Sequence, residues 1–244
     1  MPLKQRAVAG VEWAKMRGYE RHVLSHYNRV LVSSPADRNE IGFDEQVEVL
    51  PNGVDLSYFS YHVRETEAAE IVFVGKMSYY VNVASVLWFY HQVFPQIRKQ
   101  RPDARFVIVG RNPARSIEAL SADPAVEVTG TVADVRPYLN RAAVAICPMV
   151  SGSGIQNKML EAMATGVPCV ATSLACQALD IVSGREVLVA NEAGDFANAV
   201  LDLLGQPLKR RELSEASRCY VEQCHNWNTV GARLEKVFFS LSEN

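Results

Sequence analysis

The sequence predicts an α/β protein built on a doubly wound, mostly parallel sheet. From about residue 70 onward, short apolar runs alternate with segments whose apolar residues recur at helical spacing. The runs are almost continuously apolar, as expected of parallel strands that are covered on both faces. Several of them end in glycine or proline, which interrupt regular structure. The expected strands are Ile71–Val74, Arg105–Val109, Val126–Val128, Val144–Cys147, Pro168–Ala171 and Val187–Val189.

The first seventy residues follow a different pattern. Residues 1–28 look helical and carry many charges, and Arg29–Ser33 and Val47–Leu50 are expected to be short strands. The second of these ends at Pro51-Asn52-Gly53, which is a strong turn signal. This segment has too few strands for a domain of its own, so we expect it to be the end of a preceding domain.

Polar caps and apolar spacing place the helices between the strands. Asn82 is expected to cap a helix, and Pro95 falls inside the apolar pattern of that helix, so we expect a kink or break there. Asp134 should cap a short helix, and Asp195 should lie at the start of another. A final helix follows Trp227 and should pack on a surface. Its apolar residues are Val230, Leu234, Val237 and Phe238.

The composition is that of a globular protein, with 48% apolar and 21% charged residues. A net charge of −2 gives no overall field that would attract nucleic acid, so no nucleic-acid partner is expected. No apolar run approaches the roughly 18 residues that span a bilayer, and no signal peptide is visible. The five cysteines show neither a disulfide framework nor a zinc pattern. We therefore expect a cytoplasmic protein, at most peripheral at the inner membrane, with no metal site.

The most informative segment is the glycine loop Gly152-Ser153-Gly154 with the helix expected after it. Backbone amides at a helix start are unpaired and favour an anion, and glycines let a phosphate approach closely. Lys158 and Glu161 are three residues apart and share one face of that helix. They would place a cation near phosphates and a carboxylate near sugar hydroxyls, which is the outline of a nucleotide-sugar site. An ordinary loop with a solvated ion pair is the alternative.

Two better-known phosphate loops do not fit this segment. A dinucleotide-binding fingerprint needs a third glycine three residues after Gly154, where Asn157 stands. A P-loop needs Gly-Lys followed by Ser or Thr, which is absent. In open parallel sheets, ligands bind beyond the carboxyl ends of the strands. The loops of interest are therefore residues 75–82, 110–115, 130–134 and 148–154.

In their order and spacing, several motifs resemble the C-terminal, donor-binding half of retaining glycosyltransferases of the GT-B fold. Within that fold, the chain is similar to the group 1 enzymes that build bacterial exopolysaccharides and lipid-linked glycans. The resemblance runs from about Val30 to the end of the chain. The motifs are Val32-Ser33-Ser34, Leu50-Pro51-Asn52-Gly53-Val54-Asp55, Phe73-Val74-Gly75, Val107–Gly110, Thr129-Gly130-Thr131-Val132 and Leu160–Pro168.

The resemblance implies a role for each matching position. Glu161 would accept hydrogen bonds from the nucleotide ribose, and the loop from Gly152 to Gly154 would face the diphosphate and the donor sugar. The base would lie against the loop from Gly130 to Val132. Lys76, directly after Gly75, would neutralise the diphosphate leaving group, so Lys76 and Glu161 are the candidate catalytic residues. The chain contains no Asp-x-Asp, which suits a metal-independent reaction.

Two positions depart from the family pattern. The family often has a glutamate eight residues before the position of Glu161, where this chain has Ser153. It also often has a lysine five residues after the position of Lys76, where this chain has Val81. Lys158 would then supply the missing charge from the other side of the phosphates.

The family pattern divides the chain into three parts. Residues 1–45 would be the remnant of an N-terminal acceptor domain and linker, residues 46–225 the nucleotide-sugar domain, and residues 226–244 a helix that packs back toward the N-terminal domain. The expected donor is a nucleotide-diphosphate sugar, with UDP as the first nucleotide to consider, and no cofactor is expected. The acceptor would be a saccharide or lipid-linked glycan, and the uncovered interdomain surface favours self-association.

Two other functions remain open. A nucleotide-sugar epimerase shares this fold, but it needs histidine and carboxylates around the hexose, and the histidines lie outside the favoured loops. A subunit that binds a nucleotide sugar without turnover would need only the donor half of the site.

Overall fold

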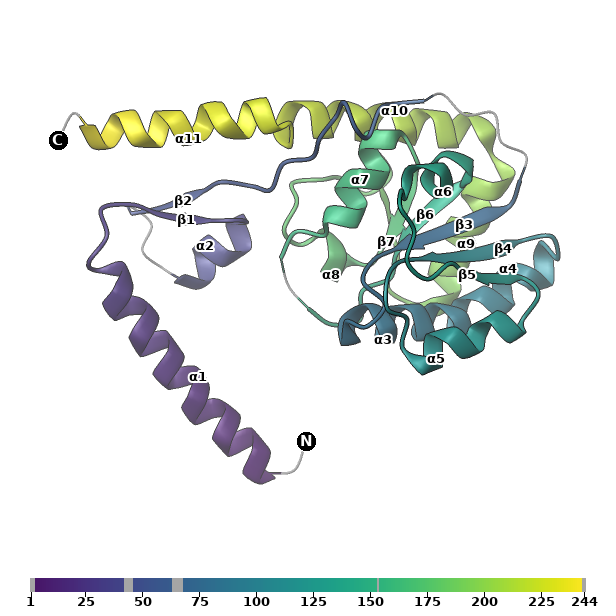
Figure 1. The fold of residues 1–244 in the computed structure, drawn as a ribbon, viewed down its shortest axis with the longest axis horizontal. Coiled ribbons are helices and arrows are strands. Elements are labelled where there is room, and N and C mark those ends of the chain that lie inside the picture. Colours follow the sequence, from purple (N-terminus) through teal and green to yellow (C-terminus); the bar gives the residue numbers. More distant parts are fainter. Residues whose placement is uncertain (1–2, 42–45, 63–67, 153, 243–244) are drawn as a thin grey trace.

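The computed structural model describes residues 3–41, 46–62, 68–152 and 154–242. Within these ranges it has a six-stranded sheet and a separate two-stranded sheet, with helices around both (Figure 1). The strands of the large sheet are β3 (Glu70–Val74), β4 (Arg105–Val109), β5 (Val126–Val128), β6 (Val144–Cys147), β7 (Cys169–Ala171) and β8 (Leu188–Val189).

The large sheet is doubly wound. Its strand order is β5-β4-β3-β6-β7-β8, and every neighbouring pair is parallel. The chain builds outward from β3 to β5, then returns to place β6 on the other side of β3, so that Ile71 pairs with both Phe106 and Val144. This change of direction creates a crevice at the carboxyl ends of the strands. The predicted fold class and the position of every predicted strand in this region are confirmed within one residue.

Helices cover both faces of this sheet, because alternate residues of a strand point to opposite faces. In β3, Ile71 and Phe73 join one apolar cluster while Val72 joins a second. The first cluster is covered by α3 (Tyr80–Trp88), the π-helical turn η1 (Phe89–Val93), α4 (Phe94–Gln100), α5 (Arg115–Glu118), the 3₁₀ turn η2 (Ala119–Ala122) and α9 (Ala193–Gly205). The second is covered mainly by α6 (Arg136–Arg141), α7 (Asn157–Thr165), α8 (Ser173–Cys176) and α10 (Pro207–Cys224).

The helix boundaries bear out most of the capping predictions. The hydrogen-bond pattern of the helical segment changes to a π-helical turn at η1, and Pro95 occupies the first turn of α4, where its missing N–H is tolerated. Asp134 accepts a hydrogen bond from the backbone N–H of Arg136 at the start of α6. Asp195 lies in the first turn of α9. The prediction that Asn82 caps α3 is wrong, because α3 begins at Tyr80 and the Asn82 side chain is buried within its first turn.

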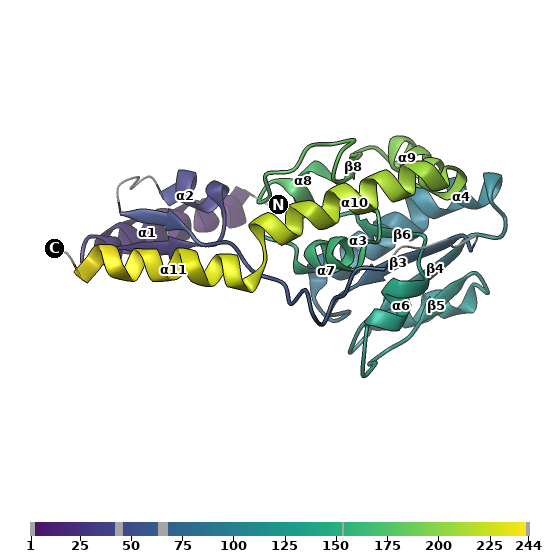
Figure 2. The same ribbon diagram turned by 90° about the horizontal axis from the view of Figure 1, so that it is seen from above.

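The N-terminal region consists of α1 (Leu3–Leu24), β1 (Val30–Val32), α2 (Pro35–Ile41) and β2 (Val47–Val49). Strands β1 and β2 form an isolated parallel pair. The final helix, α11 (Trp227–Ser242), extends alongside this pair (Figures 1 and 2). Val230 and Val237 of α11 are buried as predicted, but Phe238 is 62% exposed, so its predicted place on the packed face is wrong.

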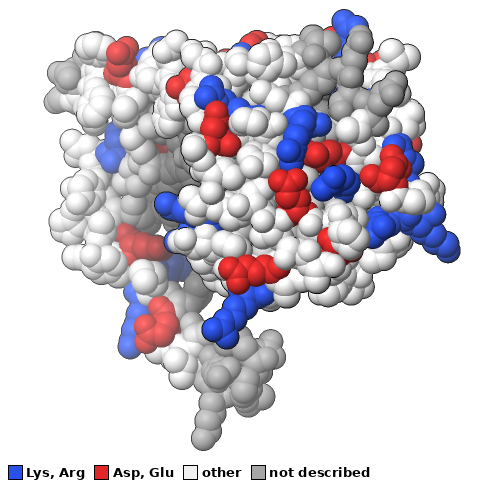
Figure 3. Space-filling model, turned by 45° about the vertical axis from the view of Figure 1, so that its right-hand side comes forward, with Lys and Arg blue, Asp and Glu red and all other residues white. Residues whose placement is uncertain are grey.

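The surface and the helix lengths bear on the setting of the protein. On the face drawn in Figure 3, basic and acidic side chains are intermixed rather than gathered in one patch. Within the described ranges, no helix combines the length and the apolar character that crossing a membrane requires.

Candidate functional site

A cavity of about 580 Å³ lies at the carboxyl ends of β3 and β4, beside the switch between β3 and β6. It opens where sheet topology predicts a ligand. The residues that line it are Val74, Gly75, Lys76, Asn82, Val109, Gly110, Arg111, Val135, Asn157, Lys158 and Glu161.

Two glycines allow the chain segments that follow β3 and β4 to approach each other closely at this cavity. Gly110 follows β4 with a φ of +153°, and a Cβ on it would lie 1.7 Å from the Gly75 carbonyl oxygen. A Cβ on Gly75 would in turn lie 2.8 Å from Nδ2 of Asn82. The glycines at these strand ends therefore permit a backbone approach that no larger residue could make.

Helix α7 provides the charged side of the cavity. Its buried face carries Met159 and Leu160, so Lys158 and Glu161 remain on the side that lines the cavity. The helix ends at Gly166, which adopts the left-handed conformation expected of such a stop. The glycine loop does not open α7 directly, since the helix begins at Asn157, three residues after Gly154.

The ammonium of Lys158 is held by neutral groups. Its Nζ donates to Oδ1 of Asn82 at 3.1 Å and to Oε1 of Gln156 at 3.0 Å. It also lies 3.8 Å from the Met149 sulfur and 5.3 Å from the centre of the Phe73 ring. Among the described residues, no carboxylate forms an ion pair with it, so its charge is available to an anion in the cavity.

Glu161 is half-buried, and burial raises the pKa of its carboxyl to about 7, an effect that the nearby Lys158 partly opposes. In the part of the chain that the structure describes, no side chain or backbone group donates a hydrogen bond to this carboxylate. The carboxylate thus faces the cavity with its acceptor positions open. Sugar hydroxyls are donors that would suit it.

The structure brings together four of the predicted site residues and leaves the others off the lining. Gly75, Lys76, Lys158 and Glu161 share the cavity, whereas Gly130, Val132, Gly152 and Gly154 do not line it. Gly130, Gly152 and Gly154 have the positive φ that favours glycine, and Val132 packs against the second apolar cluster. Ser153 lies outside the described residues.

The cavity also contains residues that the sequence reasoning did not select. Arg111 lies in the loop 110–115 after β4. The position of this loop at a strand end predicts a ligand-binding role for the loop, but Arg111 itself is not among the predicted site residues. Asn82 was assigned to capping, and nothing in its local spacing indicates that it reaches α7. Val81, which replaces the second family lysine, is buried 3.2 Å from where a Cβ on Gly152 would lie.

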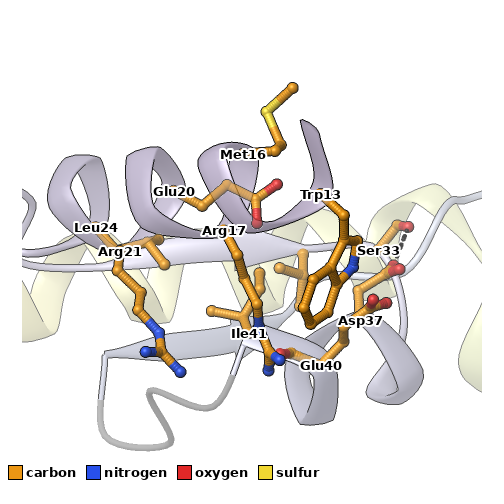
Figure 4. Close-up of a pocket in the computed structure, with 11 residues that line it drawn as sticks. Trp13, Met16, Arg17, Glu20, Arg21, Leu24, Ser33, Asp37, Glu40 and Ile41 are labelled. Atoms are coloured by element: carbon orange, nitrogen blue, oxygen red, sulfur yellow. Dashed lines mark hydrogen bonds between the residues drawn. The ribbon is translucent and has the colours of Figure 1, made fainter. Parts of the chain in front are cut away.

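A second cavity, of about 390 Å³, lies in the N-terminal region between α1, β1 and α2 (Figure 4). Two hydrogen bonds join residues of its lining. Arg17 donates to the Glu40 carbonyl at 3.1 Å, and Ser33 donates to Asp37 at 3.0 Å. Trp13 extends over one end of it.

Comparison with known proteins gives one consistent result. The family model "Glycosyl transferases group 1" matches residues 68–206. The chain is 23% identical over 226 residues to an uncharacterized 44.6 kDa protein in the cps region of Klebsiella pneumoniae, covering 89% of this chain and 58% of that protein. The chain spans about half the length of the curated relatives it matches.

Solved structures show the same fold. Alr3699/HepE from Anabaena, in complex with UDP and glucose, superposes with a TM-score of 0.72 at 15% identity, over 92% of this chain and 67% of that chain. The C-terminal domain of a glycosyl transferase group 1 family protein, LpcC from Francisella tularensis, superposes with a TM-score of 0.58 at 14% identity. That match covers 72% of this chain and the whole of the Francisella domain.

Proposed function

The chain belongs to the glycosyl transferases group 1 family, and on that premise we propose that it is the donor-binding half of a metal-independent retaining glycosyltransferase. It would bind a nucleotide-diphosphate sugar and take part in transferring the hexose to a saccharide or lipid-linked acceptor. The observation that carries this proposal is the cavity at the ends of β3 and β4, which places Lys76, Lys158 and Glu161 on one lining.

Each charged group has a proposed role in this cavity. Lys158, together with Lys76 and Arg111, supplies positive charge for the diphosphate, which leaves with a developing negative charge. Glu161 accepts hydrogen bonds from the ribose, where each bond to a charged group contributes roughly 1.5–3 kcal/mol. With three cations on the lining, the diphosphate can be neutralised without a metal ion.

The base and the sugar are proposed from the relatives. The Anabaena structure contains UDP and glucose, which supports UDP as the first nucleotide to test. The loop from Gly130 to Val132 would carry the base, and the loop from Gly152 to Gly154 would face the donor sugar. Among the described residues of these loops, none lines the cavity itself, so we propose that the loops border its ends.

We also propose that the chain has three functional parts. Residues 1–45 would belong to an acceptor domain, residues 46–225 would bind the donor, and residues 226–244 would pack back against the acceptor domain. The acceptor would bind in a cleft between the two domains. The apolar side chains that residues 1–45 expose would favour self-association of the chain.

A second candidate is a subunit that binds the nucleotide sugar without turnover on its own. The observation that favours it is coverage, since the chain corresponds to only 58% of the Klebsiella relative. An epimerase is less well supported, because no histidine is found among the described residues that line the cavity.

The proposed function can be tested by titrating the chain calorimetrically with UDP, GDP and ADP, each with and without EDTA. Saturable binding of one of them, unchanged by the chelator, would support a metal-independent donor site and identify its base. Absence of binding for all three at millimolar concentration would contradict the proposal. Sugar transfer to added glycan acceptors would then separate the transferase from the subunit that only binds.

A further inference from the structure

Asn82 is a buried polar residue on the wall of the cavity. It lies in the first turn of α3, and only 5% of its surface is exposed. Its Nδ2 donates a hydrogen bond to the Lys76 carbonyl at 3.1 Å, and its Oδ1 accepts one from Nζ of Lys158 at 3.1 Å. One amide therefore connects the loop after β3 to the helix α7, and Asn82 and Lys158 are 76 residues apart in sequence.

The chemistry of an amide suits this position. A carboxylate here would form an ion pair with Lys158 and cancel the charge that an anion in the cavity would meet. An apolar side chain would leave the Lys76 carbonyl without this donor and the ammonium without this acceptor. An amide holds the cation and leaves its charge intact.

The packing around Asn82 fixes its position. Gly75 leaves room for the amide, since a Cβ there would lie 2.8 Å from Nδ2. The preceding residue, Val81, is buried beneath Gly152, and Ser85, one turn later, donates to the Val81 carbonyl at 2.8 Å. Close packing against Gly75 and Gly152 therefore holds the first turn of α3 at the cavity wall.

We propose that Asn82 is a positioning residue for the donor diphosphate, which orients the Lys158 ammonium toward the cavity without neutralising it. This inference rests on the proposed function, because it assumes that the cavity receives a diphosphate. Asn82 acts through Lys158, and its bond to the Lys76 carbonyl holds the amide in the orientation that this requires. Asn82 of α3 would therefore orient Lys158 of α7, the cation proposed to replace the family lysine that is absent at Val81.

The test compares N82A and N82D with the unchanged protein in titrations with UDP, GDP and ADP and with their nucleosides. For the diphosphate that binds, both substitutions should weaken binding about 10-fold or more, because each removes an orienting hydrogen bond to a charged group or cancels its charge. Binding of the matching nucleoside should change less than about twofold, since Lys158 has no phosphate to meet. Circular dichroism melts would establish that both variants fold.

Two further proteins make the test specific. In a K158A background, N82A should have less than about twofold effect on diphosphate binding, because the residue through which Asn82 acts is gone. S217A is the matched control, since Ser217 is a fully buried polar residue on α10 and does not line the cavity. It should leave diphosphate and nucleoside binding unchanged.

Failure of this inference can be told from failure of the proposed function. Equal losses for diphosphate and nucleoside, or full additivity of N82A with K158A, would overturn the role of Asn82 alone. If no diphosphate binds the unchanged protein, the proposed function fails instead. In that case the titration of the Glu161 carboxyl, followed by NMR, still decides, because in N82A a Lys158 ammonium that is no longer held in place should oppose the effect of burial less and the pKa should rise above about 7. An unchanged pKa would show that Asn82 does not control this lysine.

Discussion

The six-stranded region and the N-terminal region both contain parallel strands and helices, but only the first encloses its apolar residues. The inner residues of β3, β4, β6 and β7 are buried, whereas β1 has no fully buried residue. On α1, Val11, Trp13 and Met16 are more than half exposed. Parallel strands need cover on both faces. The difference indicates that the first region encloses its own apolar core, while the second leaves large apolar side chains exposed.

The two cavities differ in the charges on their lining. Among the described residues, the N-terminal cavity is lined by two arginines and three acidic residues, whereas the cavity of the large sheet is lined by three basic residues and one acidic residue. In the cavity of the large sheet, Lys158 is held by neutral groups, and Glu161 has no described hydrogen-bond donor. A completed fold can hold charges that are not yet compensated, because the surrounding packing fixes them. Such charges are what a polar ligand needs.

The largest expected effect contrasts the two packing environments. Phe89 is fully buried, with the rings of Phe94, Phe106 and Phe196 within 6.1 Å of its own. Phe89→Ala should lower the free energy of unfolding by about 3–5 kcal/mol, since it leaves a cavity in the core. Trp13→Ala should lower it by less than about 1 kcal/mol, because Trp13 is largely exposed. Urea unfolding measures both, and similar losses would break the contrast between the regions.

The second prediction concerns Glu161. Glu161→Ala should weaken nucleoside diphosphate binding by about 2 kcal/mol, because the ribose loses a charged acceptor. The protein should remain folded, since the side chain lies on the cavity side of α7 and not in its packed face. Calorimetry against the unchanged protein gives the loss, and Glu118→Ala, at an exposed glutamate, is the control. Unfolding without a separable loss of affinity would exclude the ribose role.

The third prediction is a pH dependence of nucleotide binding. The pKa of the Glu161 carboxyl is raised to about 7 by burial, and the charged groups around the same cavity are Lys158, Lys76 and Arg111. The carboxylate that accepts ribose hydrogen bonds is lost as the pH falls through this pKa. Affinity should therefore drop about tenfold between pH 8 and pH 6. Glu161→Gln should remove this dependence, apart from what the phosphate itself contributes. An unchanged profile in that variant would assign the titration to another group.

The smallest effect tests the uncovered surface of the N-terminal region. At concentrations well above those of the binding experiments, the chain should associate weakly with itself, because α1 exposes a run of apolar side chains. Replacing Val11 and Met16 by serine should reduce this association and leave nucleotide binding unchanged. Sedimentation velocity over a range of concentrations measures it. A chain that stays monomeric throughout would contradict the proposed self-association.

Much of the large sheet could be predicted from the sequence, because its strands are short, apolar and bounded by turn residues. The predicted bounds of Arg105–Val109, Val126–Val128 and Val144–Cys147 are those of the structure. The sequence predicts the C-terminal helix and two buried residues of its packed face, Val230 and Val237, but wrongly adds Phe238 to that face. Phe238 has helical spacing, yet spacing alone does not state how wide the covered stripe is.

The candidate site was predictable where the chemistry is local and unpredictable where it is not. Lys158 and Glu161 lie three residues apart on one helix, so their shared face follows from helical geometry. Asn82 reaches Lys158 only because β3 and β6 are neighbours in the sheet, which brings the first turns of α3 and α7 to the same carboxyl edge. A capping rule applied to the local sequence therefore gave Asn82 the wrong role.

A crystal structure of the chain with the nucleoside diphosphate that binds it would show directly which cavity is the donor site. We expect diphosphate oxygens within hydrogen-bonding distance of Lys158 and a ribose hydroxyl on the Glu161 carboxylate. A nucleotide bound in the N-terminal cavity beside Trp13, or one that touches neither Lys158 nor Glu161, would contradict the assignment of the donor site to the large sheet.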